Sequence, residues 1–239
     1  MSKRILGLLL ISVVLSGCGH KNPTLKPVNT FSLGDAEPPL LSSRPTAEEL
    51  YAAVMKFHDS FETVSASYVL TVHTVGERTA KDDSASGMEI GTTTKRCDYW
   101  YKRPEEELYL VDGNYSYGSN TEENKKHPIA AWLGLDPAAN PDLARPIEHM
   151  NLLADRTLGD APVYVLELRL PYKKLKYEHA PEVRRFFLGK SDLLPRRIEI
   201  IQEHNKPIKG LACDSVTMAF SGFIVNDPLS DSIFDEQGN

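Results

Sequence analysis

Residues 164–170 read Tyr164-Val165-Leu166-Glu167-Leu168-Arg169-Leu170, so that every second residue is large and apolar. The same alternation occurs over residues 68–73 and 216–221. A period of two places successive side chains on opposite faces of a strand, and here it predicts strands with one face against a hydrophobic core. These stretches make a sheet the main element of the predicted fold.

Shorter extended runs accompany these strands, at residues 91–101, 108–111, 184–188 and 196–203. Asp112-Gly113-Asn114 predicts a hairpin turn, because these residues tolerate positive φ. Residues 128–135 and 146–153 each begin with a proline and predict two short helices in the middle of the chain. Strands, then helices, then strands predict a sheet that curves around helices.

One longer helix is predicted ahead of the strands. Thr46-Ala47-Glu48-Glu49 has the spacing of a capping box, in which the threonine and the second glutamate satisfy each other's backbone amides. Apolar residues then recur every three or four positions, at Leu50, Val54, Phe57, Phe61 and Val64. This pattern predicts a helix that ends near Val64 and lies with its apolar face against the core.

The N-terminus carries an export signal. Lys3 and Arg4 precede an uncharged run over residues 5–17, which is followed by Cys18. A charged start, a short apolar core and small residues before a cleavage point are typical of a signal peptide, and the run is too short for a permanent membrane span. An ordinary signal peptide followed by a stray thiol is the competing interpretation.

Leu15-Ser16-Gly17-Cys18 resembles the lipobox of bacterial lipoproteins. The resemblance implies cleavage after residue 17 and lipidation of Cys18, which becomes the first residue of the mature protein. Several acyl chains on one residue make release from a bilayer negligible. Residue 19 is glycine, whereas enterobacterial lipoproteins retained in the inner membrane carry aspartate there, so the periplasmic face of the outer membrane is the expected location.

The rest of the chain divides into a tether and one domain. Residues 18–43 are rich in proline and small polar residues and predict a lipidated cysteine followed by a flexible tether. Residues 44–239 have the length of a single domain with a sizeable core. We therefore expect a signal peptide at 1–17, the tether at 18–43 and the folded domain at 44–239.

Composition excludes several functions. The formal net charge is −6, which argues against a nucleic-acid partner. The seven histidines stand singly, and no motif of a serine hydrolase, a zinc protease or a redox protein occurs. We expect no catalytic residue, no metal site and no cofactor, and a protein that is not an enzyme.

Several segments in order resemble the outer-membrane lipoprotein carrier superfamily, the LolA/LolB-like proteins. They are the predicted helix with Leu50 and Phe57, the run from Leu108 to Tyr117, the central helices, Val163 to Leu168 with Phe186-Phe187-Leu188, and the ending from Leu193 to Phe234. The resemblance implies an α+β fold in which an incomplete, unclosed antiparallel β-barrel wraps around lid helices, with an N-terminal helix. It also implies an apolar cavity that receives acyl chains.

Strand alternation then selects residues for the concave side of such a barrel. The ligand cavity is predicted to be lined by Leu70, Val72, Leu108, Leu110, Trp132, Leu166, Leu168, Ile198, Met218 and Phe220. Tyr68 and Ile200 belong to the same face, and Ile129, Trp132 and Leu133 belong to the lid. The competing interpretation is that these residues pack as an ordinary core with no cavity.

Two thiols remain after lipidation of Cys18. Cys97 and Cys213 would meet an oxidising compartment, where a disulfide between them and two buried free thiols are equally compatible with the sequence.

Together these features predict a membrane-anchored envelope lipoprotein that binds a lipid, or the acyl chains of another lipoprotein, for lipid or lipoprotein trafficking. The alternative is a regulatory or scaffolding lipoprotein that binds an envelope protein through the same fold, as RseB-like sensors do.

Overall fold

The computed structural model describes residues 28–76, 90–103, 106–111, 114–116, 133, 146–171, 173–174, 178–179, 181–203, 211–230 and 233. For residues 106–111, 114–116, 173–174, 178–179 and 211–212 it describes the backbone.

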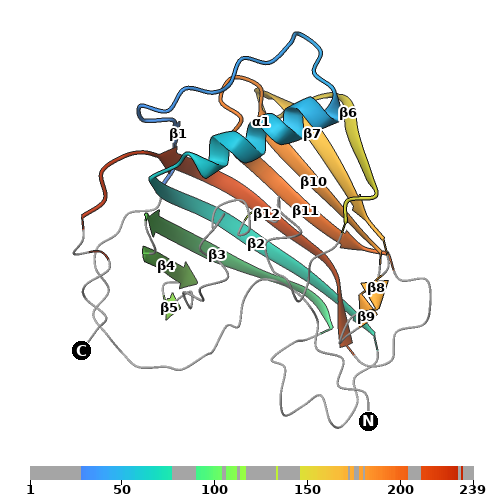
Figure 1. The fold of residues 1–239 in the computed structure, drawn as a ribbon. Helices are drawn as coiled ribbons and strands as arrows, with labels where there is room; N and C mark the ends of the chain where they lie inside the picture. Colours follow the sequence, from blue (N-terminus) through green and yellow to red (C-terminus); the bar gives the residue numbers. More distant parts are fainter. Residues whose placement is uncertain are drawn as a thin grey trace.

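One twisted sheet dominates these residues (Figure 1). Its strands are β1 (Phe31–Ser32), β2 (Thr63–Gly76), β3 (Gly91–Lys102), β4 (Glu106–Val111), β5 (Asn114–Ser116), β6 (His149–Leu158), β7 (Ala161–Leu170), β10 (Glu182–Gly189), β11 (Pro195–Gln202) and β12 (Leu211–Val225). They pair antiparallel in the order β5-β4-β3-β2-β12-β11-β10-β7-β6, and β1 pairs in parallel with β12. Two further short strands, β8 (Lys173–Lys174) and β9 (Glu178–His179), pair with each other.

The path of described strands starts at β5 and ends at β6, so they do not close into a barrel. With the helix α1 (Ala47–Asp59) across one face, this is the predicted α+β architecture of an unclosed antiparallel barrel with an N-terminal helix. The predicted strands at 68–73, 164–170 and 216–221 are confirmed as parts of β2, β7 and β12. The predicted hairpin is also confirmed, since Val111 of β4 pairs with Asn114 of β5.

The capping box forms at the start of α1, with Thr46 Oγ1 accepting from the Glu49 amide at 3.2 Å and Glu49 Oε2 accepting from the Thr46 amide at 2.9 Å. The helix ends at Asp59 rather than near Val64. Beyond it, Phe61 and Val64 remain fully buried, but Val64 already pairs with Tyr101 as part of β2. The apolar periodicity therefore outlasts the helix, because the loop and the strand that follow bury their residues in the same core.

The helix predicted at residues 146–153 is wrong. His149–Leu158 forms β6, in which Leu152 pairs with Leu166 of β7 and Met150 pairs with Leu168. Pairing with an apolar neighbouring strand overrides the weak local preference of this segment. The other predicted helix, residues 128–135, lies outside the described residues except for Leu133.

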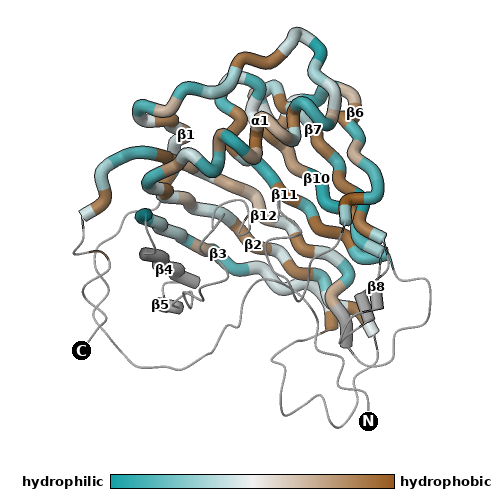
Figure 2. Tube along the Cα trace, viewed as in Figure 1, coloured by the Kyte–Doolittle hydropathy of each residue, from teal (hydrophilic) through white to brown (hydrophobic). Residues whose placement is uncertain are grey.

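Register assigns each strand residue to one of two faces. The inner face, which α1 covers, carries Leu70, Leu166, Phe186, Ile198 and Met218, which pair across neighbouring strands. The outer face carries the intervening residues, among them Ser67, Val69, Val165, Arg185 and Arg197. Figure 2 shows the resulting alternation of hydrophobic and hydrophilic positions along the strands.

Part of the predicted tether packs against the sheet. Residues 28–43 are described, and Phe31, Leu33, Ala36 and Leu41 pack against the main core. Leu40, in contrast, is fully exposed. The boundaries at 1–17, 18–43 and 44–239 stay predictions, since residues 1–27 lie outside the described part of the chain.

Candidate functional site

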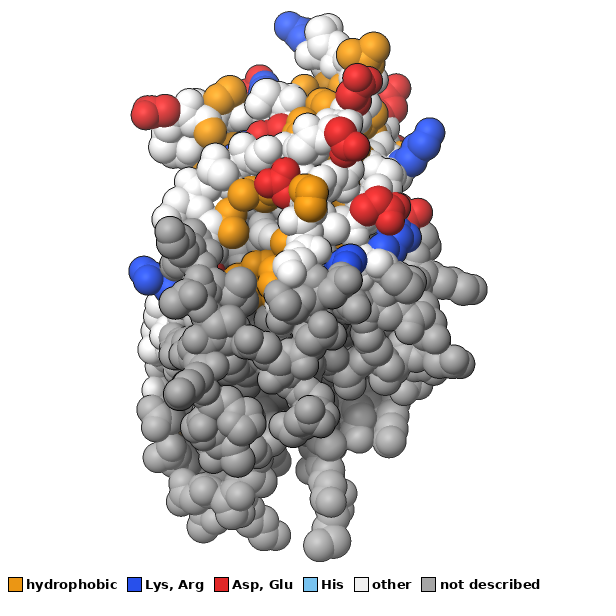
Figure 3. Space-filling view, turned by 90° about the vertical axis from the view of Figure 1, so that its left-hand side faces the viewer, with side chains coloured by type: hydrophobic (Ala, Val, Ile, Leu, Met, Phe, Trp, Pro, Cys, Tyr) orange, Lys and Arg blue, Asp and Glu red, His pale blue; other side chains and the backbone are white. Residues whose placement is uncertain are grey.

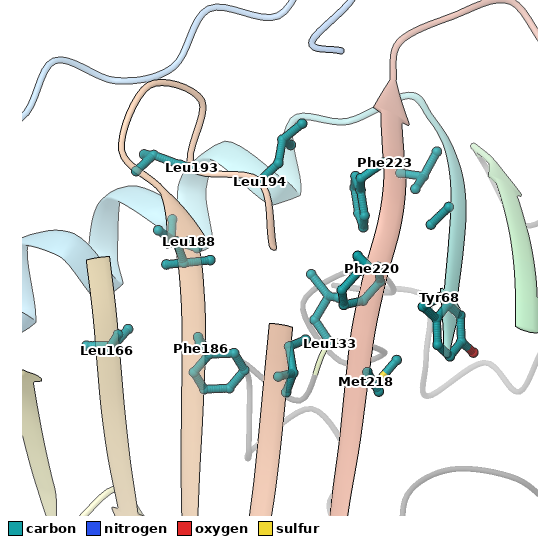
Figure 4. Close-up of a cluster of buried hydrophobic side chains, with 14 of the residues drawn as sticks. Tyr68, Leu133, Leu166, Phe186, Leu188, Leu193, Leu194, Met218, Phe220 and Phe223 are labelled. Carbon is teal, nitrogen blue, oxygen red and sulfur yellow. The ribbon is translucent and has the colours of Figure 1, made fainter. Parts of the chain in front are cut away.

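The candidate site is the inner face of the sheet together with α1. Leu50, Val54 and Phe57 of α1 are almost fully buried against this face. Figure 4 shows the core, where Leu166, Phe186, Leu188, Met218 and Phe220 come from three different strands and Leu133 lies between Phe186 and Met218 in the view. Complete burial of one such side chain stabilises the fold by about 1.5–3 kcal/mol.

Most of the residues predicted for the cavity are brought together here. Leu70, Leu166, Leu168, Ile198, Met218 and Phe220 are buried in one continuous cluster, and Val72 packs against it half-buried. Tyr68, Ile200 and Leu133, which were also predicted, belong to the same cluster or pack against it. Their role as a ligand cavity stays a prediction, because side chains fill the part of the face beneath α1.

Three predicted residues are not placed there. Register pairs Leu108 with Trp100 and Leu110 with Asp98. Trp100 and Asp98 pair in turn with Ser65 and Ser67, so this register assigns Leu108 and Leu110 to the outer face, contrary to the prediction. The sequence shows that residues of β4 alternate between two faces. Which of them lie on the inner face is decided by the pairing with β3. Trp132 lies outside the described residues.

The inner face changes from apolar to polar along the strands. Successive rows across β7, β10 and β11 are Leu166–Phe186–Ile198, then Leu168–Arg184–Ile200, then Leu170–Glu182–Gln202. The first row lies nearest α1 and is fully apolar, and the third carries two polar residues. An extended apolar surface with a polar end has the amphipathic character of a lipid.

The polar end is held together by side-chain contacts. Arg184 Nε donates to Glu182 Oε1 at 2.5 Å, and Gln202 Nε2 donates to Glu182 Oε2 at 2.9 Å. Glu182 is only 4% exposed, so pairing with Arg184 is what makes burial of its charge tolerable. The sequence analysis missed this group, although Glu182, Arg184 and Phe186 are two positions apart in β10 and so lie on the same face of the strand.

A buried histidine fixes the end of α1. His58 is completely buried, and its Nε2 donates to the Leu193 carbonyl at 3.2 Å across the turn between β10 and β11. Its Nδ1 has no hydrogen-bond partner. Burial lowers the pKa of His58 from 6.5 to about 4, outweighing the opposite effect of the bond to Leu193.

Cys97 and Cys213 are both buried and are not joined in a disulfide, so of the two interpretations the buried thiols hold. Cys97 pairs with Tyr68 and Cys213 pairs with Thr74, positions about 20 Å apart along β2, whereas a disulfide requires Cα atoms within about 7 Å. Burial first, then the Asp214 and Glu182 carboxylates, raise the pKa of the Cys213 thiol to about 11. Such a thiol is unreactive.

Within the described part of the chain, no group of three or more histidine, cysteine or acidic side chains is arranged to hold a metal ion. None of the described helices is long and apolar enough to cross a bilayer.

No protein-family model and no curated protein sequence matches this chain. Among solved structures it is similar to a LolA superfamily protein from Nitrosomonas europaea, at 14% identity over 81% of this chain and 99% of that one, with a TM-score of 0.27. It is also similar to the lipoprotein LppX of Mycobacterium tuberculosis, at 9% identity over 77% of this chain and 95% of that one, with a TM-score of 0.35. The MucA/MucB complex of Pseudomonas aeruginosa matches at 9% identity over 77% of this chain and 59% of that one, with a TM-score of 0.34.

At these identities and TM-scores no residue role passes from those proteins to this chain.

Proposed function

We propose that this protein is a membrane-anchored envelope lipoprotein that binds acyl chains on the inner face of its sheet and takes part in lipid or lipoprotein trafficking. The observation that carries the proposal is the inner face itself, which is apolar beneath α1 and ends in the row that contains Glu182 and Gln202. An amphiphile bound there directs its chain towards α1 and its head towards the polar row.

The middle of the three rows, which contains Ile200, offers a place for an acyl chain to enter. Ile200 of β11, Val216 of β12 and Val72 of β2 form one row on the inner face. Val216 is buried, whereas Ile200 and Val72 are only partly buried and pack against the edge of the core. Each methylene of an acyl chain that leaves water for such a surface contributes about 0.8 kcal/mol.

Anchoring rests on the lipobox that ends at Cys18. Acylation of this residue attaches the protein to a membrane, and Gly19 favours the outer one. The net charge of −6 gives the protein no attraction to anionic headgroups, so attachment depends on the acyl chains rather than on charge.

Two adjacent isoleucines provide a matched test. Ile200 and Ile201 follow each other on β11, but Ile200 lies on the inner face and Ile201 pairs with Ser215 on the outer face. Both are partly buried. We expect Ile200→Asn to weaken binding of fluorescent palmitic acid about tenfold, which corresponds to about 1.4 kcal/mol. Ile201→Asn leaves binding unchanged.

Titration of the purified proteins by fluorescence, with circular dichroism as a check on folding, gives the answer. Equal weakening in the two variants would place the ligand elsewhere. A folded parent protein that binds no acyl probe but forms a stable complex with an envelope protein would instead support the regulatory, RseB-like alternative.

A further inference from the structure

The segment just after the predicted lipidation site is built into the sheet. The Val28 amide donates to Ser67 Oγ of β2 at 2.7 Å, and the Phe223 amide of β12 donates to the Thr30 carbonyl at 2.8 Å. Phe31 and Ser32 then pair in parallel with Phe223 and Ile224. The segment over residues 28–34 is here called the strap.

The strap occupies a place left open by the neighbouring strand. β11 begins at Pro195 and pairs with β12 only as far as Ala219, so the last residues of β12 extend beyond β11. β1 fills the position beside them. Arg196, next to the start of β11, places its Cζ 3.6 Å from the ring centroid of Phe31 and forms an ion pair with Asp192 at 2.5 Å.

Two glycines are required for this close approach. A Cβ at Gly222 of β12 would overlap the Val28 carbonyl, and a Cβ at Gly34 would lie 2.6 Å from the Val225 carbonyl. Gly34 also has φ +56°, which favours glycine. The sheet and the strap are therefore complementary in shape at both ends of the contact.

Docking moves the point at which the chain leaves the domain. From β1 the chain runs over the end of the sheet to the start of α1 beside β6 and β7 (Figure 1). Without the strap contact the domain would be held by its α1 end, about 100 Å of extended chain from Cys18. With the strap docked, it is held at Ser67 and Gly222, at most about 35 Å of extended chain from Cys18.

We infer that docking of the strap shortens the free connection to the chain between Cys18 and Val28. The docked domain therefore stays within about 35 Å of the membrane in which Cys18 is anchored. The inference rests on the proposed acylation of Cys18. The net charge of −6 gives the protein no attraction to anionic headgroups. On the described part of the side shown in Figure 3, acidic, basic and hydrophobic side chains are interspersed. The domain consequently exchanges acyl chains with its own membrane and with molecules close to it.

Two insertions of equal length test the strap. Ten Gly and Ser residues placed between residues 27 and 28 lengthen the connection to the membrane, from about 17 Å to about 25 Å in root-mean-square distance. The same ten residues placed after the fully exposed Leu40 lengthen only the loop between the strap and α1. If the strap is docked, the first insertion increases the distance between the domain and the membrane, and the second leaves that distance unchanged.

The readout is energy transfer from a dye on Val69→Cys to acceptor lipids in phosphatidylcholine vesicles that carry the acylated full-length protein. Val69 is exposed on the outer face of β2, while Cys97 and Cys213 are buried and escape labelling. We expect lower transfer after the first insertion and parental transfer after the second. Adding Gly222→Val, which displaces the strap, makes the second insertion lower the transfer too.

Equal loss of energy transfer from both insertions in the parent background would overturn the inference that the docked strap sets the distance to the membrane, even with acyl-probe binding intact. Loss of acyl-probe binding with the asymmetry preserved would overturn the proposed function and leave the strap standing. A full-length protein that carries no acyl group and does not bind vesicles would overturn both.

Discussion

His58 makes the stability of this protein depend on pH in a way that one substitution removes. The imidazole is completely buried beside the rings of Phe57 and Phe61, with its Nε2 on the Leu193 carbonyl and its Nδ1 unpartnered. A proton on Nδ1 would place a positive charge on a completely buried ring whose Nδ1 has no hydrogen-bond partner. The fold therefore favours the neutral ring.

The magnitude follows from the two pKa values. The pKa of His58 is lowered from 6.5 to about 4, so the unfolded state takes up a proton at higher pH than the folded state does. Stability from this group is complete above pH 6.5 and is lost as the pH falls from 6.5 towards 4. The full difference is about 3 kcal/mol, and about 2 kcal/mol is lost between pH 7.5 and pH 5.

Urea unfolding at pH 7.5 and pH 5 measures this loss. We expect the parent to lose about 2 kcal/mol more than His58→Phe over this interval, because phenylalanine does not titrate. His58→Gln, whose amide can still donate to the Leu193 carbonyl, serves as a second non-titrating variant. His73→Gln, on the outer face of β2, is the histidine substitution used for comparison. An equal loss in the parent and in both His58 variants would refute the reasoning.

Three further outcomes are expected. Leu166→Ala removes a fully buried inner-face side chain and lowers the free energy of unfolding by about 2–5 kcal/mol, whereas Leu153→Ala, at a partly buried outer-face position, costs less; urea denaturation compares them. Thr46→Ala removes the capping box of α1 and costs about 1 kcal/mol by the same assay, and a cost below that of Glu48→Ala, an exposed first-turn position outside the capping box, would contradict the cap. Cys97 and Cys213 gain no iodoacetamide adduct in the native protein and are both labelled in urea, as mass spectrometry can detect; labelling of either in the native state would contradict their burial.

Local patterns in the sequence predicted much of this architecture. The alternation in 164–170 and 216–221 is visible without any partner, because a strand that buries one face must repeat every second residue. The capping box at Thr46 is likewise local, since its two hydrogen bonds join residues three positions apart. These patterns correctly placed Leu166, Leu168, Met218 and Phe220 on one face.

Other features depend on residues far away in the chain. Residues 149–153 became part of a strand because β7 offers an edge with matching apolar residues. Leu108 and Leu110 were assigned to the wrong face, since a shift of one residue in pairing with β3 exchanges the two faces of β4. The absence of a disulfide follows from the distance between two rows of the sheet, which no cysteine spacing reveals.

The sequence by itself determined the start of α1 and the alternation of the longest strands, because these depend on near neighbours in the chain. The export signal stays a prediction from the same kind of local pattern. Only the tertiary structure decided where Glu182 and Arg184 meet Gln202, how His58 reaches Leu193, and that residues 28–34 dock beside β12. These contacts join segments that are distant in the sequence, and they depend on how the strands pair and on which elements lie side by side. Their energies become available only when the sheet has brought distant residues together.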